Sequence, residues 1–220
     1  MVDLMAESGC WLVSVGFETL NEDNLDDVGK RQNTIEEYER AVSLLHDRGI
    51  AIEGNFIFGF DGDTEGVFDT TAQFAVDVGI DIPEFFMLTP YPGTRLYEEL
   101  EKQGRIVDRD WSHYENVHFR YPPVFEPRHM TREQLRRGCL RADRLAYSSR
   151  NTLRRLWNSR ICRPAVMLAN YVNMRRIMHR NDLLPRVLPP EEGAEPRRDG
   201  SDVVCHNPRQ RWTPESAGGN

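Results

Sequence analysis

The sequence predicts an α/β fold in which parallel strands alternate with helices, and two observations carry this prediction. Short β-branched and aromatic runs alternate with segments whose apolar residues recur at helical spacing. Two of these helical segments end at Gly49 and Gly79, and an isoleucine opens a new apolar run directly after each glycine. This βαβαβα order is typical of parallel strands joined by right-handed crossover helices.

The acidic first half supplies these elements in turn. A short helix at 1–8 precedes a strand at 11–17. Thr34 and Glu37 form a capping-box pattern that begins the helix ending at Gly49, and strand 50–58 follows. A helix at 67–78, strand 84–88 and a helix at 94–103 complete the series. The second and third strands are apolar on both faces, as buried parallel strands are, and three strands leave open edges that do not close a barrel.

The second half is expected to be helical and then disordered. Residues 105–130 are irregular and rich in aromatic residues, and a second capping box opens a long Arg-rich helical region at 131–158. Pro164 suits the first turn of a further helix at 164–178, and the segment from Pro185 onward lacks apolar periodicity. We therefore predict a barrel portion at 1–127, an Arg-rich helical region at 128–184 and a disordered tail at 185–220.

Charge separates the two halves of this 220-residue chain. The formal charge is −7, but residues 1–127 carry 9 Lys and Arg against 26 Asp and Glu, whereas residues 128–220 carry 19 against 9. No run approaches the roughly 18 apolar residues of a spanning helix, and no signal peptide is visible. The four cysteines have neither disulfide-framework nor metal-ligand spacing, so we expect reduced thiols, a cytoplasmic location and no metal site made by this chain.

Chemistry in a parallel α/β fold is expected at the carboxyl ends of the strands, where loops and helix N-termini converge. Glu18 closes the first strand, and a carboxylate there can accept hydrogen bonds from a ribose diol. The simpler interpretation is a carboxylate stabilised by the dipole of the next helix. Asp61 and Asp63 are interpreted as turn and cap residues, and 89–93 as a rigid turn.

Several segments at these ends together resemble the later strands of the radical S-adenosylmethionine (SAM) core. Within that superfamily, the likeness is to the C-terminal portion of cobalamin-binding radical SAM proteins and covers roughly the first 60% of the chain. Three motifs in the correct order and spacing give a specific signal, although each alone is weak. The segments are Gly16-Phe17-Glu18, Lys30 with Asn33, Gly54 to Phe60, Thr89 to Thr94, and Asp110 to Tyr114.

The resemblance implies a partial (β/α) barrel of later strands only, a type of TIM barrel, and it implies roles for particular residues. Glu18 corresponds to the ribose-contacting position, and Lys30 to a basic position that pairs with the cofactor's carboxylate, although a solvated lysine explains Lys30 as well. Tyr91 is expected to face substrate or to pack. The remaining implied contacts are with adenine and involve Asn55, Phe56, Ile57, Phe58, Thr89 and Pro90.

The sequence also departs from the family pattern. The C-x3-C-x2-C loop that holds a [4Fe–4S] cluster is absent, because no two cysteines lie closer than 23 residues. The glycine-rich segment and the preceding cobalamin domain are absent too. The resemblance implies SAM, a [4Fe–4S] cluster and cobalamin as cofactors, with the last two held elsewhere. We therefore expect a fragment or subunit that is inactive alone and pairs with the missing N-terminal half-barrel and cobalamin domain.

The Arg-rich region has three interpretations. The first is an amphipathic helix whose arginines meet the acidic half, and the second is contact with an anionic membrane surface through Trp157 and neighbouring apolar residues. Nucleic-acid binding comes third, because the acidic half repels phosphate and no recognition motif is present.

Two alternatives to the enzyme remain at this stage. One is a non-catalytic half-barrel that serves as a binding or assembly module. The other is an unrelated phosphate-binding α/β protein, which no glycine-rich phosphate loop supports. For the enzyme, the reaction is reductive cleavage of SAM to a 5′-deoxyadenosyl radical, then hydrogen abstraction and cobalamin-dependent methyl transfer, on a small-molecule or lipid substrate.

Overall fold

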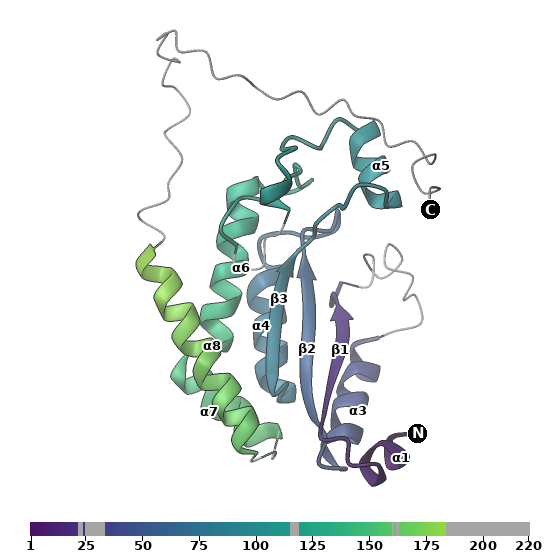
Figure 1. Cartoon of the computed structure of the whole chain (residues 1–220), viewed down its shortest axis with the longest axis vertical. Coiled ribbons are helices and arrows are strands. Elements are labelled where there is room, and N and C mark those ends of the chain that lie inside the picture. The colour runs from purple at the N-terminus through teal and green to yellow at the C-terminus, as the bar shows by residue number, and fades with distance from the viewer. Residues whose placement is uncertain (22–23, 25–33, 115–118, 160, 162, 184–220) are drawn as a thin grey trace, which may run out of the picture. The chain divides into compact units, whose positions relative to one another are not determined.

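Three parallel strands form the central sheet: β1 (Leu12–Glu18), β2 (Ala51–Phe58) and β3 (Ile82–Met87), in the order β1-β2-β3 (Figure 1). The structure is a computed structural model that describes residues 1–21, 24, 34–114, 119–159, 161 and 163–183. Helix α1 (Val2–Glu7) precedes β1, α3 (Ile35–His46) joins β1 to β2, and α4 (Val67–Val78) joins β2 to β3. The predicted parallel βαβαβ order is confirmed. The predicted disordered tail and Lys30 lie outside the described residues.

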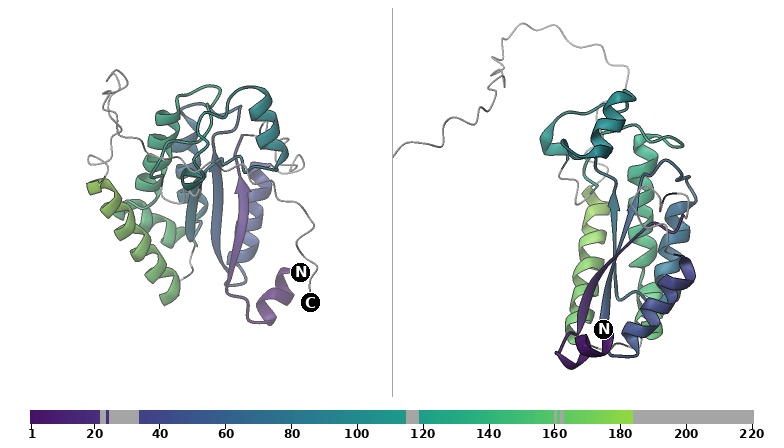
Figure 2. Two further views of the ribbon diagram at one scale, coloured as in Figure 1. Left: turned by 45° about the horizontal axis from the view of Figure 1, so that its top comes forward. Right: turned by 90° about the vertical axis from the view of Figure 1, so that its right-hand side faces the viewer.

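One face of the sheet packs against helices through a row of aromatic rings. Phe56 lies between Phe17 and Phe85, with ring centroids 5.3 and 5.8 Å away, and all three side chains are buried. Phe58 meets Phe68 of α4 at 4.9 Å. These rings form the core between the sheet and helices α3, α4 and α6 (Arg132–Ala146), which lie behind the sheet in Figure 1 and to its right in the right-hand view of Figure 2.

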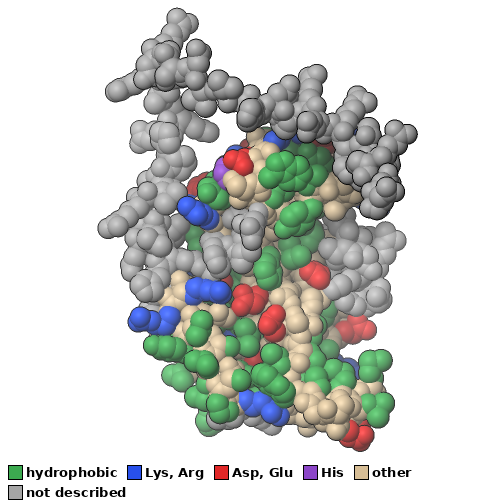
Figure 3. Space-filling view, in the orientation of Figure 1, with side chains coloured by type: hydrophobic (Ala, Val, Ile, Leu, Met, Phe, Trp, Pro, Cys, Tyr) green, Lys and Arg blue, Asp and Glu red, His purple; other side chains and the backbone are tan. Residues whose placement is uncertain are grey.

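The other face of the sheet, here called the open face, corrects the expectation that both faces are apolar. Side chains alternate along a strand, so this face carries Ser14, Glu53, Asn55 and Glu84, none of which is fully buried. Acidic and hydrophobic side chains share it (Figure 3). A sheet that is covered by helices on one face only can keep polar groups on the other.

Helix α8 (Pro164–Leu183) covers part of the open face (Figure 2). Val166 packs with Ala51 at the amino end of β2, and Asn173 Nδ2 donates to Glu84 Oε1 of β3 at 2.9 Å. The helix begins at Pro164 as predicted, because a proline in the first turn gives up only a donor that would have no partner in the helix.

Local chemistry explains where most elements begin and end. Thr34 and Glu37 form the predicted capping box, and Gly79 ends α4 in a left-handed conformation (φ 82°). Thr94 caps α5 (Arg95–Lys102). Strand β3 begins two residues earlier than predicted and includes Pro83, which an edge strand tolerates; the Pro83 carbonyl accepts the Tyr147 hydroxyl at 2.9 Å.

The predicted Arg-rich helical region consists of two helices over 132–159. α6 ends at Ala146, and α7 (Ser149–Ser159) starts anew after Ser148. Tyr147 leaves helical geometry (φ −99°, ψ 13°), and the Asn151 side chain caps the Leu145 carbonyl at 2.9 Å. Both helices then pack against α4, as a single straight helix would not.

The arginines of α6 and α7 meet acidic side chains of the first half. Arg141 pairs with Asp69 and Arg154 with Asp77, each at 2.9 Å. Arg155 is fully buried, and its guanidinium donates to the backbone carbonyl of Ile80 at 3.1 Å and to Asn170 Oδ1 at 2.8 Å. The first interpretation of the Arg-rich region, docking on the acidic half, is therefore confirmed for these helices.

Candidate functional site at the carboxyl ends of the strands

Glu18 ends β1 in an unusual backbone conformation. Its φ is +64°, and the register of β1 against β2 shifts between Gly16 and Glu18. The Thr19 amide bonds the Phe17 carbonyl at 2.9 Å, which makes a tight turn centred on Glu18. A left-handed conformation costs a non-glycine residue about 1–3 kcal/mol and persists where surrounding contacts enforce it, often at functional sites. The half-buried Glu18 is therefore the strongest local candidate at this end of the sheet.

Tyr38 of α3 stabilises the same turn through its hydroxyl group and its ring. Its buried hydroxyl donates to the Phe17 carbonyl at 2.9 Å, and its ring meets the Phe17 ring edge-on at 5.0 Å. The carbonyl thus accepts two hydrogen bonds, one from the tyrosine and one from the Thr19 amide. Tyr38 is a positioning residue for Glu18 that the sequence did not reveal, because the contact depends on tertiary packing.

The side chains of 55–58, the segment predicted to contact adenine, alternate between the two faces of the sheet. Phe56 and Phe58 are buried in the core under the helices, so their side chains are not available to a ligand and only their backbone is. Asn55 and Ile57 lie on the open face, half-buried, and Asn55 Nδ2 donates to Ser14 Oγ at 2.8 Å. The assignment of Asn55, Ile57 and the backbone of 56–58 to adenine contacts stays a prediction.

The end of β3 supplies the third part of the site. Thr89 Oγ1 donates to the Met87 carbonyl at 3.2 Å, and Pro90 is buried. The roles of Thr89 and Pro90 toward a cofactor stay predictions. Phe86 pairs in register with Ile57 and is 37% exposed on the open face. Sequence analysis missed Phe86; its alternation with the buried Phe85 was the signal that could have identified it.

The loop after β2 is tied to the loop after β1 by Asp63. This buried carboxylate accepts the amides of Gly59 and Phe60 at 2.8 and 3.1 Å, and Asn24 Nδ2 at 2.7 Å. Burial raises the pKa of Asp63 above its ordinary value, although these hydrogen bonds act in the other direction. Asp63 therefore stabilises the loop after β2 and does not cap a helix, since Gly66 is the N-cap of α4 and no side chain caps it.

Asp61 lies in a turn, as expected, and also forms an ion pair. It forms a bidentate ion pair with Arg105, whose Nη2 lies 2.7 Å from Asp61 Oδ1 and whose Nη1 lies 3.0 Å from Oδ2. Arg128 also reaches Asp61 Oδ2 at 3.1 Å. Burial raises the pKa of Asp61, but the two arginines outweigh it and leave the pKa below its ordinary value. Asp61 therefore anchors the segment after α5 to the loop after β2.

The described residues do not form a metal-binding site. Among them, no three His, Cys, Asp or Glu side chains are grouped so as to hold a metal ion. Cys10 and Cys139 are free thiols; burial raises the pKa of the Cys139 thiol well above its ordinary value, which opposes thiolate ligation.

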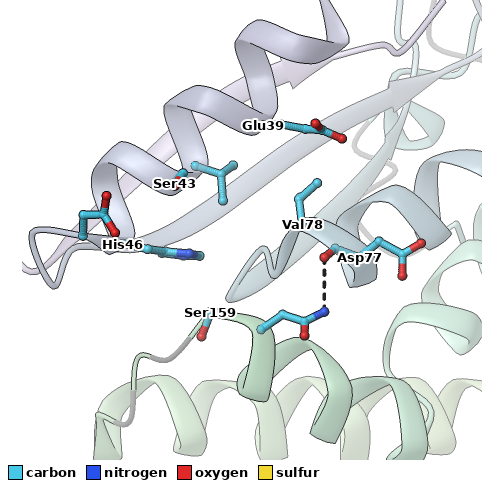
Figure 4. A pocket seen from close by; sticks show the side chains of 9 residues that line it. Glu39, Ser43, His46, Asp77, Val78 and Ser159 are labelled. Atoms are coloured by element: carbon cyan, nitrogen blue, oxygen red, sulfur yellow. Dashed lines mark hydrogen bonds between the residues drawn. The ribbon is translucent and has the colours of Figure 1, made fainter.

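A cavity of about 460 Å³ lies at the opposite end of the fold, between α3, α4 and α7. Glu39, Ser43, His46 and Asp77 line it, and Asn158 Nδ2 donates to the Asp77 carbonyl at 3.1 Å (Figure 4). His46 Nε2 lies 3.0 Å from Asp81 Oδ2 beneath the cavity. The last turns of α3 and α4 place the cavity at the amino ends of the strands, away from Glu18, so it does not belong to the candidate site.

Comparison with known proteins shows which family part of the chain resembles. Residues 1–75, which contain β1, β2 and Glu18, match the model of the radical SAM superfamily. The resemblance predicted from the motifs is confirmed, and it implies SAM and a [4Fe–4S] cluster as the cofactors of the superfamily.

Individual proteins with similar sequences include methyltransferases and a cyclase. Bacteriochlorophyllide d C-12(1)-methyltransferase of Chlorobaculum tepidum is 38% identical over 156 residues, 71% of this chain and 33% of the relative. Anaerobic magnesium-protoporphyrin IX monomethyl ester cyclase of Rubrivivax gelatinosus is 33% identical over 135 residues, 61% of this chain and 23% of the cyclase. The chain thus spans a third or less of the length of these relatives.

One solved structure resembles part of the chain. It is the radical SAM methyltransferase TsrM of Kitasatospora setae with cobalamin and a [4Fe–4S] cluster bound, at a TM-score of 0.43 and 26% identity. The alignment covers 50% of this chain and 22% of TsrM.

Proposed function

We propose that this chain is the adenosine-binding, C-terminal portion of a cobalamin-dependent radical SAM methyltransferase. The observation that carries the proposal is the strained Glu18 at the carboxyl end of β1, within the segment that matches the superfamily. Glu18 is proposed to accept the ribose hydroxyls, while Asn55, Ile57 and the backbone of β2 flank adenine. When SAM and the cluster are bound in such enzymes, they supply the 5′-deoxyadenosyl radical, and cobalamin carries the methyl group.

The residues of this chain fit the adenosine part of SAM but not the iron–sulfur cluster. Glu18 offers a carboxylate to a diol, and Ile57 and Phe86 offer apolar surface on the open face. Cluster ligation requires thiolates, and the sequence has no cysteines at the required spacing. We therefore propose that the chain holds the nucleoside and does not catalyse the reaction alone, with the cluster and cobalamin held by a further domain or chain.

The free edge of β1 is the proposed junction with that further domain. In the described sheet, β1 has β2 on one side and no strand on the other. The opposite edge is different, because α6 packs along β3 and the Tyr147 hydroxyl engages the Pro83 carbonyl. An exposed strand edge is a template for another strand. Added strands are therefore expected beside β1, where they would extend the sheet toward a barrel.

The substrate class is proposed from the relatives. Two of them are named for methyl transfer to bacteriochlorophyllide d and another for cyclisation of magnesium-protoporphyrin IX monomethyl ester. We propose methyl transfer to carbon of a tetrapyrrole as the reaction of the assembled enzyme. A non-catalytic assembly module remains the second candidate, favoured by the free β1 edge; this candidate predicts strand pairing without nucleoside binding.

A cytoplasmic location with peripheral membrane contact is proposed from the surface of α7 and α8. In the part of the chain described, no helix has the length and apolar character needed to cross a membrane. Arginines and large apolar side chains are exposed together on these helices, a pattern that favours anionic lipid surfaces. Flotation with vesicles should depend on anionic lipid. The exposed apolar residues are Leu153, Trp157, Met167, Leu168, Tyr171 and Val172.

The proposed function is tested by titrating the isotope-labelled chain with SAM and with 5′-deoxyadenosine while recording amide NMR shifts. We expect shifts at the carboxyl ends of β1 to β3, and affinities for the two ligands within about tenfold, because the contacts proposed for the described residues are all with the nucleoside. Binding of neither ligand would overturn the nucleoside site. Robust 5′-deoxyadenosine formation by the reconstituted, reduced chain would overturn the claim that it is inactive alone.

A further inference from the structure

Three aromatic rings lie together beyond the carboxyl end of β3. Tyr91, Trp111 and Tyr114, here called the aromatic shelf, lie side by side: the Tyr114 ring centroid is 5.5 Å from Trp111 and 6.5 Å from Tyr91. Tyr114 is buried and forms the base, whereas Trp111 is 68% and Tyr91 55% exposed. Tyr91 comes one residue after Pro90, so the shelf adjoins the proposed nucleoside site.

Packing inside the described fold does not account for the two outer rings. A buried tryptophan or tyrosine contributes to stability by removing its surface from water, and here most of that surface remains exposed. Exposed aromatic groups beside a site are typical of surfaces that stack against flat ligands or partners. The shelf is therefore better explained by a ligand than by the core.

The turn that carries Trp111 is held rigid by two carboxylates. Asp110 Oδ1 accepts the Ser112 amide at 2.9 Å, and Asp108 lies 2.8 Å from His113 Nδ1 and accepts the Asp110 amide at 3.0 Å. The base of the shelf is fixed too, since the Tyr114 hydroxyl donates to the Asp108 carbonyl at 3.3 Å. Such preorganisation lowers the entropy lost when a ligand binds.

The guanidinium of Arg109 lies close enough to Tyr114 to interact with it electrostatically. Arg109 donates to the Tyr97 hydroxyl at 3.2 Å and to Glu101 at 2.8 Å, and its side chain is still 61% exposed. Its guanidinium can therefore meet an anionic group at the rim of a ligand. The shelf thus combines stacking surface with the exposed guanidinium of Arg109, which Glu101 neutralises in part. A flat conjugated macrocycle fits this combination when one of its peripheral carboxylates shares Arg109 with Glu101.

We propose that the aromatic shelf binds the flat face of a tetrapyrrole, with Trp111 and Tyr91 stacking on the ring system and Arg109 meeting a peripheral carboxylate. The proposal rests on the proposed function for the substrate class, and it adds the residues that select a planar substrate. None of the three is expected to touch SAM.

The test is a titration of the full chain with zinc protoporphyrin IX, a flat macrocycle with two carboxylates, followed by the absorbance of the macrocycle. Trp111→Ala and Tyr91→Ala should each weaken binding by about tenfold, because a stacked aromatic pair contributes roughly 1.4 kcal/mol. Trp11→Ala is the control, because Trp11 is 40% exposed just before β1, at the opposite end of the sheet from the shelf; binding should change less than twofold.

Two results would overturn the shelf: equal affinity of Trp111→Ala and wild type, or an equal loss in Trp11→Ala, which would indicate non-specific adsorption. Far-UV circular dichroism establishes that each variant is folded. SAM titration separates the two proposals. If Trp111→Ala no longer binds the macrocycle but still binds SAM, both proposals stand. If the wild-type protein binds the macrocycle but does not bind SAM, only the nucleoside site is overturned.

Discussion

Replacing Gly138 by alanine should destabilise the protein, although the same change in most helices has the opposite effect. Gly138 lies in α6 where this helix crosses α4, and a Cβ there would lie 2.2, 2.3 and 2.4 Å from three carbons of the Phe68 ring. The ring cannot swing away freely, because Phe68 is 1% exposed and packs on Phe58 at 4.9 Å. Alanine gains about 1 kcal/mol in helix propensity, and overpacking costs about 1–3 kcal/mol and sometimes more.

Contacts this short place the overpacking cost at about 2–3 kcal/mol, the upper part of that range. We therefore expect a net loss of about 1–2 kcal/mol in the free energy of unfolding, or about 2–8 °C in melting temperature for a domain of this size. Urea and thermal unfolding measure it. Gly66→Ala is the control, since no atom lies within 4 Å of its added Cβ, and it should change stability by less than about 0.5 kcal/mol. Phe68→Leu should offset part of the loss in the double variant. A Gly138→Ala protein as stable as wild type would refute the described packing of α6 on α4.

Three further predictions concern the loops at the candidate site. Asp63→Ala should cost about 2–3 kcal/mol in urea unfolding, because it leaves the buried amides of Gly59 and Phe60 without their acceptor; an unchanged midpoint would contradict this. Burial raises the pKa of Asp108, but the Asp110 amide and His113 outweigh it and leave the pKa lowered. A lowered folded-state pKa gives stability that is present above the unfolded value of about 3.9 and is lost as pH falls below it. Trp111 fluorescence should therefore change below about pH 4 in wild type, whereas Asp108→Asn should show no such transition. Tyr38→Phe removes the hydroxyl that fixes the Glu18 turn and should weaken SAM binding several-fold by NMR titration, with at most about 1 kcal/mol lost in stability; unchanged affinity would deny Tyr38 its positioning role.

The order of elements could be predicted from the sequence because local signals coincide with the fold. The helix ends at Gly49 and Gly79 and the capping box at Thr34 each determine a boundary through the backbone of a few neighbouring residues. The break after Ala146 could not be predicted, since it depends on Tyr147 reaching the Pro83 carbonyl 64 residues away.

The candidate site was predictable in position and not in detail. A carboxylate at the end of an apolar strand identified Glu18, but its positive φ and its support by Tyr38 require the tertiary structure. Alternation along β2 separates Asn55 and Ile57 from the buried Phe56 and Phe58, yet which face is open depends on where the helices pack. Phe86 was missed for the same reason.

The aromatic shelf illustrates a third kind of limit. Sequence analysis left Tyr91 between substrate contact and packing, and composition marked 105–130 only as aromatic-rich. In the structure, more than half of the surface of Tyr91 and of Trp111 is exposed, so packing alone does not explain them. The short helix at Trp111–His113 brings Trp111 to Tyr114, which in turn contacts Tyr91. Long-range placement of irregular segments has no periodic signal in the sequence.

The most direct test of the nucleoside site compares adenosine with 2′,3′-dideoxyadenosine in wild type, Glu18→Gln and the control Glu36→Gln, an exposed glutamate of α3. Hydrogen bonds to a charged group contribute about 1.5–3 kcal/mol, so wild type and Glu36→Gln should prefer adenosine by at least about tenfold in NMR titrations. Glu18→Gln should lose most of that preference while it still binds the dideoxy compound. An equal preference for adenosine in all three proteins would contradict the assignment of Glu18 to the ribose.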